Sequence, residues 1–263
     1  MLLVVTHDVD WGRWGPSDVH VIERLHRFDL WDRARFFGLR ENLYNGISLV
    51  MEFEQRQGFR STFFFRPFYD DGTSVELYAD VVSELRRGGW EVGLHANKCD
   101  SLESIAVEKR VVEKVYAEPV ASLRAHYLRI DKGLIQRLGS IGIKFDSSLT
   151  MSRNMFRVES SGCGFIGSVV ELPITIMDTY MFSYWGVNPL NAFEKLIEFL
   201  STLHKSGVEI ATILWHTNSV RMVGGRSYLK FVEEIWRFEW LEPIRVKDVE
   251  KYLSLCRKVF DNI

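Results

Sequence analysis

Short apolar runs rich in β-branched and aromatic residues recur along this chain of 263 residues, and longer amphipathic stretches separate them. Continuous apolar runs of this length are typical of strands buried on both faces, as in parallel sheets. The runs that predict strands are residues 2–6, 61–65, 90–94, 120–123, 141–145, 169–174 and 210–215. Their alternation with helical stretches favours right-handed βαβ units. The sequence therefore predicts one α/β domain over residues 1–263, a distorted parallel (β/α)7 barrel.

Helical periodicity fills the gaps between these runs. The clearest helix begins at Asn188 and Pro189, a cap residue followed by proline at the first helical position. It ends near Gly207, which fits a C-terminal cap. Further helices are predicted over residues 102–115, 228–236 and 246–255.

The stretch between Trp11 and Arg60 is too long for a single crossover helix. We therefore predict a helical insertion or lid at about residues 12–58. Five aromatic residues in and beside this segment are candidates to frame a pocket: Trp11, Trp14, Trp31, Phe36 and Phe37.

Charge and cysteine content narrow the class of protein. The net charge is −2 with no run of like charges, so a nucleic-acid-binding surface has little support. No apolar run approaches the ~20 residues that a membrane-spanning helix needs. The three cysteines are irregularly spaced, which predicts no disulfide framework and favours a reducing compartment. Because no signal peptide precedes the first predicted strand, a cytoplasmic location is expected.

Polar, titratable residues follow six of the seven predicted strands. In a parallel barrel, catalytic residues lie at the carboxyl ends of the strands. Residues at these ends are therefore expected to converge on one site, and they are Asp8, Asp10, His95, Arg124, His126, Asp146, Asp178 and His216.

Asp8 and Asp10 are two positions apart, so both side chains project to the same side while the strand persists. Two carboxylates at one barrel mouth repel each other, which favours a bound cation or a raised pKa on one of them. The alternative is that one of the two carboxylates caps the next helix.

The order of these motifs resembles the polysaccharide deacetylase (NodB-homology, carbohydrate esterase 4-like) family of metal-dependent carbohydrate de-N-acetylases. The resemblance extends over nearly the whole chain. It rests on the segments Thr6-His7-Asp8-Val9-Asp10, Ser61-Thr62-Phe63-Phe64-Phe65, Gly93-Leu94-His95, Arg124-Ala125-His126-Tyr127, Phe145-Asp146-Ser147-Ser148 and Leu214-Trp215-His216-Thr217.

The resemblance implies a role for most of these residues. Asp8 matches the catalytic base, Asp10 the first metal ligand and His95 the first histidine of the metal-binding motif. Arg124 matches the arginine that orients the base, His216 the general acid, and Asp178 its acidic partner. The Asp-x-Asp spacing resembles the branch that acts on peptidoglycan-like or small amide substrates.

One departure concerns the third metal ligand. The family's second histidine follows the first by four residues, and Cys99 occupies that position here, with Asn97 nearby. His126 stands two residues after Arg124, where the common pattern has a proline. Our hypothesis is that His126 supplies the third ligand to one divalent ion, with zinc expected before other transition metals. A Cys99 thiolate is the alternative, since zinc accepts both sulfur and nitrogen.

The leading functional hypothesis is a metal-dependent hydrolase that removes an N-acyl group, foremost N-acetyl, from an amino sugar or glycan precursor. Its alternatives are a C–N hydrolase for a small non-sugar amide and a non-catalytic sugar-binding barrel without the metal site. A glycosidase using Asp8 and Asp10 is a weaker alternative, because paired glycosidase carboxylates lie ~5 Å or more apart. The expected partner is a small-molecule or glycan substrate, and the sequence makes no prediction about oligomeric state.

Other residues beside the motifs have simpler interpretations. Tyr127, Tyr180 and Trp215 are candidates to line a pocket or to pack in the core. Arg129 is expected to pair with Asp131 or Asp146. Asp146 either positions substrate or caps the Ser147-Ser148 turn.

Overall fold

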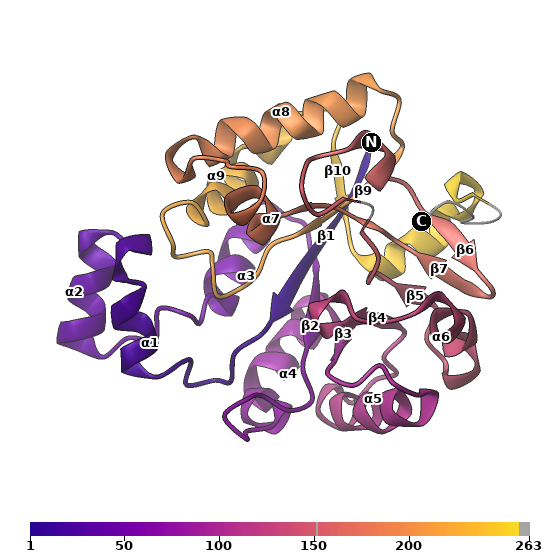
Figure 1. The fold of residues 1–263 in the computed structure, drawn as a ribbon, viewed down its shortest axis with the longest axis horizontal. Helices are drawn as coiled ribbons and strands as arrows, with labels where there is room; N and C mark the ends of the chain where they lie inside the picture. Colours follow the sequence, from indigo (N-terminus) through magenta and orange to yellow (C-terminus); the bar gives the residue numbers. More distant parts are fainter. Residues whose placement is uncertain (151, 258–263) are drawn as a thin grey trace.

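A curled, mostly parallel sheet forms the centre of the molecule (Figure 1). The computed structural model describes residues 1–150 and 152–257, and within them ten strands join one sheet. The strand order is β6-β7-β5-β4-β3-β2-β1-β9-β8, and β10 pairs with β1 outside this path. The strands are β1 (Leu2–Val9), β2 (Thr62–Phe65), β3 (Glu91–Ala96), β4 (Ser122–Ala125), β5 (Phe145–Asp146), β6 (Gly164–Ile166), β7 (Val169–Glu171), β8 (Ile174–Met177), β9 (Ile210–Leu214) and β10 (Glu242–Ile244). The predicted single-domain α/β barrel class is confirmed.

Strand β1 is the central strand, and every one of its eight residues is buried. Its first half pairs with β9 on one side and β10 on the other, and its second half pairs with β2, all in parallel. Partners on both edges and packing on both faces explain why the strand begins as the apolar run Leu2 to Val5. The carboxyl end of β1 carries Asp8, and Asp10 follows it directly.

The prediction of seven strands was wrong in three places. The run 169–174 divides into β7, which pairs with β5, and β8, which pairs with β9. Pro173 lies at the break, where a residue without an N–H cannot continue the ladder. The run 141–145 contributes only its last residue to a strand, β5. Finally, β6 and β10 are three-residue strands with partly exposed side chains, so they lack the continuous apolar signal.

Helices surround the sheet, and most lie where the sequence predicts them. The predicted helix 102–115 is α5, and the helix expected from Asn188 comprises η6 and α8. The segment 246–255 is a 3-10 helix, η8. The α-helices are α1 (Asp18–Glu23), α2 (Leu30–Leu39), α3 (Ile47–Arg56), α4 (Ala79–Gly88), α5 (Leu102–Tyr116), α6 (Lys132–Arg137), α7 (Asp178–Ser183), α8 (Ala192–Lys205) and α9 (Arg226–Glu234). The 3-10 helices are η1 (Leu25–Arg27), η2 (Val75–Tyr78), η3 (His126–Leu128), η4 (Leu138–Ile141), η5 (Val158–Ser160), η6 (Pro189–Asn191), η7 (Ile235–Arg237) and η8 (Val246–Leu255).

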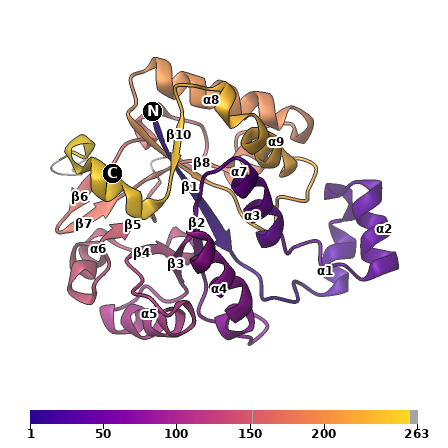
Figure 2. The same ribbon diagram turned by 180° about the vertical axis from the view of Figure 1, so that it is seen from behind.

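The stretch from 12 to 58 contains α1, η1, α2 and α3. Helices α1 and α2 project to one side of the barrel in both views (Figure 1, Figure 2). They enclose a small apolar cluster of their own around Phe28, Phe36 and Tyr44. Helix α3 instead packs on the main core through Ile47 and Val50. That the segment acts as a lid stays a prediction.

A buried polar network ties α3 to the central strand. The carboxylate of Glu54, on α3, accepts hydrogen bonds from the Tyr228 hydroxyl at 2.7 Å and the Ser61 hydroxyl at 2.7 Å. It also accepts from the Trp90 indole at 2.7 Å and lies 3.0 Å from His7 Nε2 on β1. All five side chains are buried, so the network satisfies polar groups that have no access to water.

Cys163 and Cys256 form a disulfide across 93 residues of sequence, which overturns the expectation of unpaired cysteines. The fold brings the two together because the chain after η8 runs beside β6, where Arg257 N–H donates to the Cys163 carbonyl at 2.9 Å. Spacing along the sequence does not reveal such a long-range pair. The reducing compartment was inferred from unpaired cysteines, and that inference loses its basis. No helix within the described residues is long and apolar enough to cross a membrane.

Candidate metal and catalytic site

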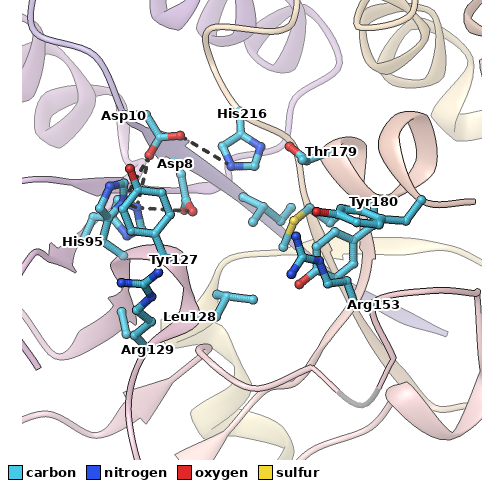
Figure 3. Close-up of a pocket in the computed structure, with 15 residues that line it drawn as sticks. Asp8, Asp10, His95, Tyr127, Leu128, Arg129, Arg153, Thr179, Tyr180 and His216 are labelled. Atoms are coloured by element: carbon cyan, nitrogen blue, oxygen red, sulfur yellow. Dashed lines mark hydrogen bonds and ion pairs between the residues drawn. The ribbon is translucent and has the colours of Figure 1, made fainter.

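Five of the eight polar residues predicted to meet at the strand ends line one cavity, and they are Asp8, Asp10, His95, His126 and His216 (Figure 3). Asp8 and Asp10 come from the end of β1, His95 from β3, and His216 from the segment after β9. His126 is the first residue of η3, directly after β4. Parallel strands place all of their carboxyl ends at one edge, which explains the meeting of residues so distant in sequence.

Three side chains form a compact cluster of candidate ligand atoms. Asp10 Oδ1 lies 3.2 Å from His95 Nε2 and 3.7 Å from His126 Nδ1. His126 Nδ1 lies 3.0 Å from His95 Nε2. Ligands at zinc–nitrogen distances in a tetrahedral site are about 3.3 Å from each other. The triangle formed by Asp10, His95 and His126 therefore has the dimensions of three ligands around one ion.

The protonation states of the cluster also fit a cation. His95 Nδ1 lies 3.1 Å from the Arg124 carbonyl, which can only accept, so Nδ1 carries the proton and Nε2 presents a lone pair to the cluster. Burial lowers the pKa of His126 to about 4, so its ring is neutral at pH 7. Burial alone would raise the pKa of Asp10, but the contact with His95 and the positive charge of His216 hold it below its usual range.

One atom of the cluster, Asp10 Oδ1, is buried without a hydrogen-bond partner among the described residues, and so is Nε2 of His126, the ring nitrogen that does not face the cluster. Buried polar atoms in folded proteins are nearly always satisfied by protein, water or an ion. An orphaned carboxylate oxygen beside two imidazoles is the donor set that a divalent transition metal prefers. The residues present therefore fit a metal ion.

Asn97 and Cys99, the other candidates for the third metal ligand, make contacts outside the cluster. The Asn97 amide accepts from Arg66 Nε at 2.7 Å and donates to the Phe68 carbonyl at 2.7 Å. Cys99 packs against the main core, and burial raises the pKa of its thiol to about 12, which disfavours the thiolate. Within the described residues, Cys99 joins no group of three candidate His, Cys, Asp or Glu ligand atoms.

Arg124 holds Asp8 in place. The Arg124 guanidinium is fully buried, and its Nη1 donates to Asp8 Oδ1 at 2.9 Å and to Thr6 Oγ1 at 2.9 Å. Nε and Nη2 donate to the carbonyl and hydroxyl of Ser147 at 2.8 and 2.7 Å. The second oxygen of Asp8 lies 3.6 Å from His95 Nε2, next to the ligand cluster. Asp8 is therefore a fixed carboxylate with one oxygen directed toward the position that a metal would occupy.

His216 and Asp178 form a second ordered pair on the other side of Asp10. His216 Nδ1 lies 2.6 Å from Asp178 Oδ1, and the His216 backbone N–H donates to Asp178 Oδ2 at 3.1 Å. His216 Nε2 lies 3.6 Å from Asp10 Oδ2. Burial lowers the pKa of His216, but Asp178 and the other carboxylates raise it to about 10 overall. Ser219, whose hydroxyl donates to Asp178, was not singled out in the sequence because it follows no strand.

The cavity has a volume of about 420 Å³, within the range of small-molecule sites. A second cavity of about 460 Å³ shares Asp10, Thr179 and His216 with it. Five side chains that line the first cavity carry no sequence signal of a site: Leu128, Arg153, Met177, Thr179 and Tyr184.

The aromatic residues that were predicted to line a pocket lie in different environments. Tyr127 and Tyr180 line the first cavity. Trp215 is fully buried in the main core beside Tyr228, because strand alternation turns it away from the site. None of the five aromatic residues of the segment around 11–37 lines either cavity. Trp14 and Trp31 are instead 71% and 80% exposed.

Asp146 has a structural role. It accepts from the Ser148 hydroxyl at 2.7 Å and the Ser148 backbone N–H at 3.2 Å, so the predicted turn cap is confirmed. The residue is fully buried and lines neither cavity. Burial raises the pKa of Asp146, and burial together with the neighbouring Asp146 raises the pKa of Glu171 well above its usual value.

A strained turn follows His126. Tyr127 and Leu128 both have φ of 57°, in the left-handed region that costs a non-glycine residue roughly 1–2 kcal/mol. The turn directs four consecutive residues, His126 to Arg129, into the wall of one cavity. Backbone strain of this kind persists where the surrounding structure imposes it, often at functional sites.

Comparisons with known proteins agree with the fold. No protein-family profile matches the sequence, and no curated protein sequence matches it significantly. Among solved structures, a candidate polysaccharide deacetylase from Mycobacterium smegmatis matches with a TM-score of 0.70 at 16% identity, covering 100% of this chain and 94% of that one. A CE4 family pseudoenzyme from Bacillus anthracis matches with a TM-score of 0.52 at 10% identity, covering 98% and 66%. A mutant of the pseudoenzyme with restored activity matches at 0.52 and 11%, covering 98% and 69%. The chain thus shares the barrel fold of the polysaccharide deacetylases.

Proposed function

We propose that this protein is a metal-dependent amide hydrolase that removes an N-acyl group, foremost acetyl, from an amino sugar or glycan precursor. One observation carries the proposal: the Asp10, His95 and His126 cluster lies between a carboxylate held by Arg124 and an imidazole held by Asp178. These are the base, the metal ligands and the acid that hydrolysis of an amide requires. The shared fold with polysaccharide deacetylases supports it.

Asp10, His95 and His126 would hold one divalent ion, with zinc expected first from the nitrogen and oxygen ligand set. When bound, such an ion supplies Lewis-acid polarisation of the amide carbonyl and lowers the pKa of water at the site. The Arg124 carbonyl fixes the orientation of the His95 ring, and the His126 ring is neutral, so its nitrogen can bind a metal ion.

Asp8 accepts the proton of the attacking water. Arg124 binds one of its oxygens, so the carboxylate cannot turn away and the other oxygen faces the cluster. Thr6 and Ser147 hold the guanidinium in turn, and the whole assembly is buried beneath the cavity floor. A carboxylate held in this orientation needs little rearrangement to reach its position in the transition state.

His216 protonates the departing nitrogen. Asp178 accepts from Nδ1, which leaves the Nε2 proton facing the cavity. Because Asp178 and the nearby carboxylates raise the pKa of His216, its ring is protonated at neutral pH, as a general acid must be. Amine departure without a proton is slow, so this residue completes the chemistry.

A non-catalytic sugar-binding barrel is the second candidate. Its support is the cysteine at position 99 in place of the usual second histidine, together with a solved pseudoenzyme of the same fold. A hydrolase of small non-sugar amides would use the same residues as the proposed enzyme. The glycosidase alternative loses support, because Asp8 and Asp10 belong to one cluster whose ligand atoms lie within 4.8 Å of one another.

Acetate release tests the proposal. The purified protein is incubated with N-acetylglucosamine, its short oligomers and small N-acetylated amines, before and after treatment with a chelator and again after zinc is restored. We expect acetate from at least one sugar, activity lost on chelation by more than ~100-fold, and recovery with zinc. Binding of the sugars without acetate release under all conditions would favour the non-catalytic barrel.

A further inference from the structure

Two arginines, Arg129 and Arg153, line the first cavity, Arg129 on the side of His95 and Tyr127 and Arg153 on the side of Tyr180 (Figure 3). Arg129 comes from the segment after η3, and Arg153 from the irregular segment before η5. Tyr127, Tyr180 and Tyr184 line the same cavity. The proposed mechanism uses none of these five side chains.

Aromatic rings, and not carboxylates, position both guanidinium groups. The Arg129 guanidinium carbon lies 5.4 Å from the centre of the Tyr127 ring, and that of Arg153 lies 4.2 Å from the centre of the Tyr184 ring. Cation–π contacts hold a guanidinium through its face and leave its N–H donors free. The predicted pairing of Arg129 with Asp131 or Asp146 was wrong, because Asp131 caps α6 and Asp146 binds Ser148.

Neither arginine makes an ion pair or a side-chain hydrogen bond within residues 1–150 and 152–257. Other arginines that line or support the site, such as Arg66 and Arg124, bind a carboxylate. The cavity's own carboxylates are Asp8 and Asp10, which face Arg124 and the imidazoles. The cavity lining therefore carries two exposed arginines that no carboxylate among the described residues pairs with.

The strained turn at Tyr127 and Leu128 shapes the lining of this cavity. The two left-handed residues lie between His126 and Arg129, and all four residues line the same cavity. The turn thus fixes a guanidinium near the metal ligands at a cost in backbone strain. On the facing side, the Trp185 indole donates to the Arg153 carbonyl at 3.1 Å and anchors the second arginine.

We propose that Arg129 and Arg153 bind an anionic group, a carboxylate or a phosphate, carried by the substrate next to its N-acylated sugar ring. A guanidinium presents paired N–H donors that match both of these anions. The tyrosines supply flat surfaces against which a sugar ring packs. This inference rests on the proposed function, since it assigns the substrate class of the same cavity: an acidic N-acyl amino sugar.

Three probes of similar size test the inference: neutral N-acetylglucosamine, N-acetylglucosamine 1-phosphate and N-acetylmuramic acid. The parent is compared with the Arg129→Gln, Arg153→Gln and double variants, by calorimetric binding and by acetate release. We expect the double variant to lose ~100-fold in affinity and in kcat/KM for one or both acidic sugars. For the neutral sugar we expect a change below about threefold. The two acidic probes distinguish phosphate from carboxylate.

The controls separate this inference from the proposed function. Arg157→Gln removes an exposed arginine from the same segment outside the cavity and should change nothing. Arg129→Lys and Arg153→Lys keep the charge but not the paired donors, so we expect partial recovery. If no sugar is hydrolysed, arginine-dependent binding of an acidic sugar still supports the anion site. Equal affinity of the parent and the double variant for both acidic sugars would overturn it, whether or not acetate is released.

Discussion

Substitution of Asp8 by asparagine is expected to lower kcat/KM for amide hydrolysis by about 10³-fold while the protein keeps its metal ion. Asparagine has the shape of aspartate but cannot accept a proton from water, and general bases typically contribute 10²–10⁴-fold. Because the proposed ligands are Asp10, His95 and His126, we expect the variant to keep its metal ion; loss of the ion would instead favour the second group of candidate ligands, Asp8, Asp10 and His216. Acetate release and elemental analysis of the same preparation check both halves of the expectation.

The Asp8→Asn variant should also fold. Arg124 loses a charged partner but keeps its hydrogen bonds to Thr6 Oγ1 and to the carbonyl and hydroxyl of Ser147. The Asp100→Asn variant, which changes an exposed carboxylate, is the matched control and should retain full activity. An Asp8→Asn protein that is folded, metal-loaded and as active as the parent would exclude Asp8 as the base.

Substitution of Glu54 by alanine is expected to lower the free energy of unfolding by at least ~3 kcal/mol. The change leaves three buried donors without their acceptor: Ser61, Trp90 and Tyr228. Each buried polar group left unsatisfied costs about 1–3 kcal/mol. Urea denaturation followed by tryptophan fluorescence and circular dichroism measures the loss, with the slope of the transition checked for two-state behaviour.

Glu52 provides the control on the same helix. Its side chain is half exposed and pairs with Arg56 one turn later, so Glu52→Ala should change stability by no more than ~0.5 kcal/mol. Glu54→Gln keeps the shape of the side chain but turns one acceptor into a donor, and an intermediate loss is expected. A loss below ~1 kcal/mol for Glu54→Ala would show that water replaces the carboxylate and that the network does not stabilise the barrel.

The fold was predictable from the sequence where strands are buried on both faces. The apolar runs at 2–6 and 210–215 became β1 and β9, because a central parallel strand must be apolar along its length. The short strands β6 and β10 were missed because their side chains are partly exposed and the apolar pattern weakens. The break at Pro173 was missed because residues 169–174 are buried and form one continuous run.

The candidate site was predictable for a related reason. Residues at the ends of parallel strands meet whatever their separation in sequence, so Asp8, Asp10, His95, His126 and His216 could be grouped without a structure. Residues that reach the site from irregular segments, such as Arg153, carry no periodic signal. The pairing of Cys163 with Cys256 was unpredictable because it depends on the return of the chain's end to β6.

Metal analysis of three proteins tests the central claim most directly. The parent, His126→Ala and Cys99→Ala are purified in parallel, dialysed against buffer with a small excess of zinc, and then against metal-free buffer. The account predicts about one ion per chain in the parent and in Cys99→Ala, and loss of the ion from His126→Ala, because three ligands hold the ion and removal of one leaves two. A parent that retains no divalent ion, or a His126→Ala protein that retains it as tightly as the parent, would contradict the proposed site.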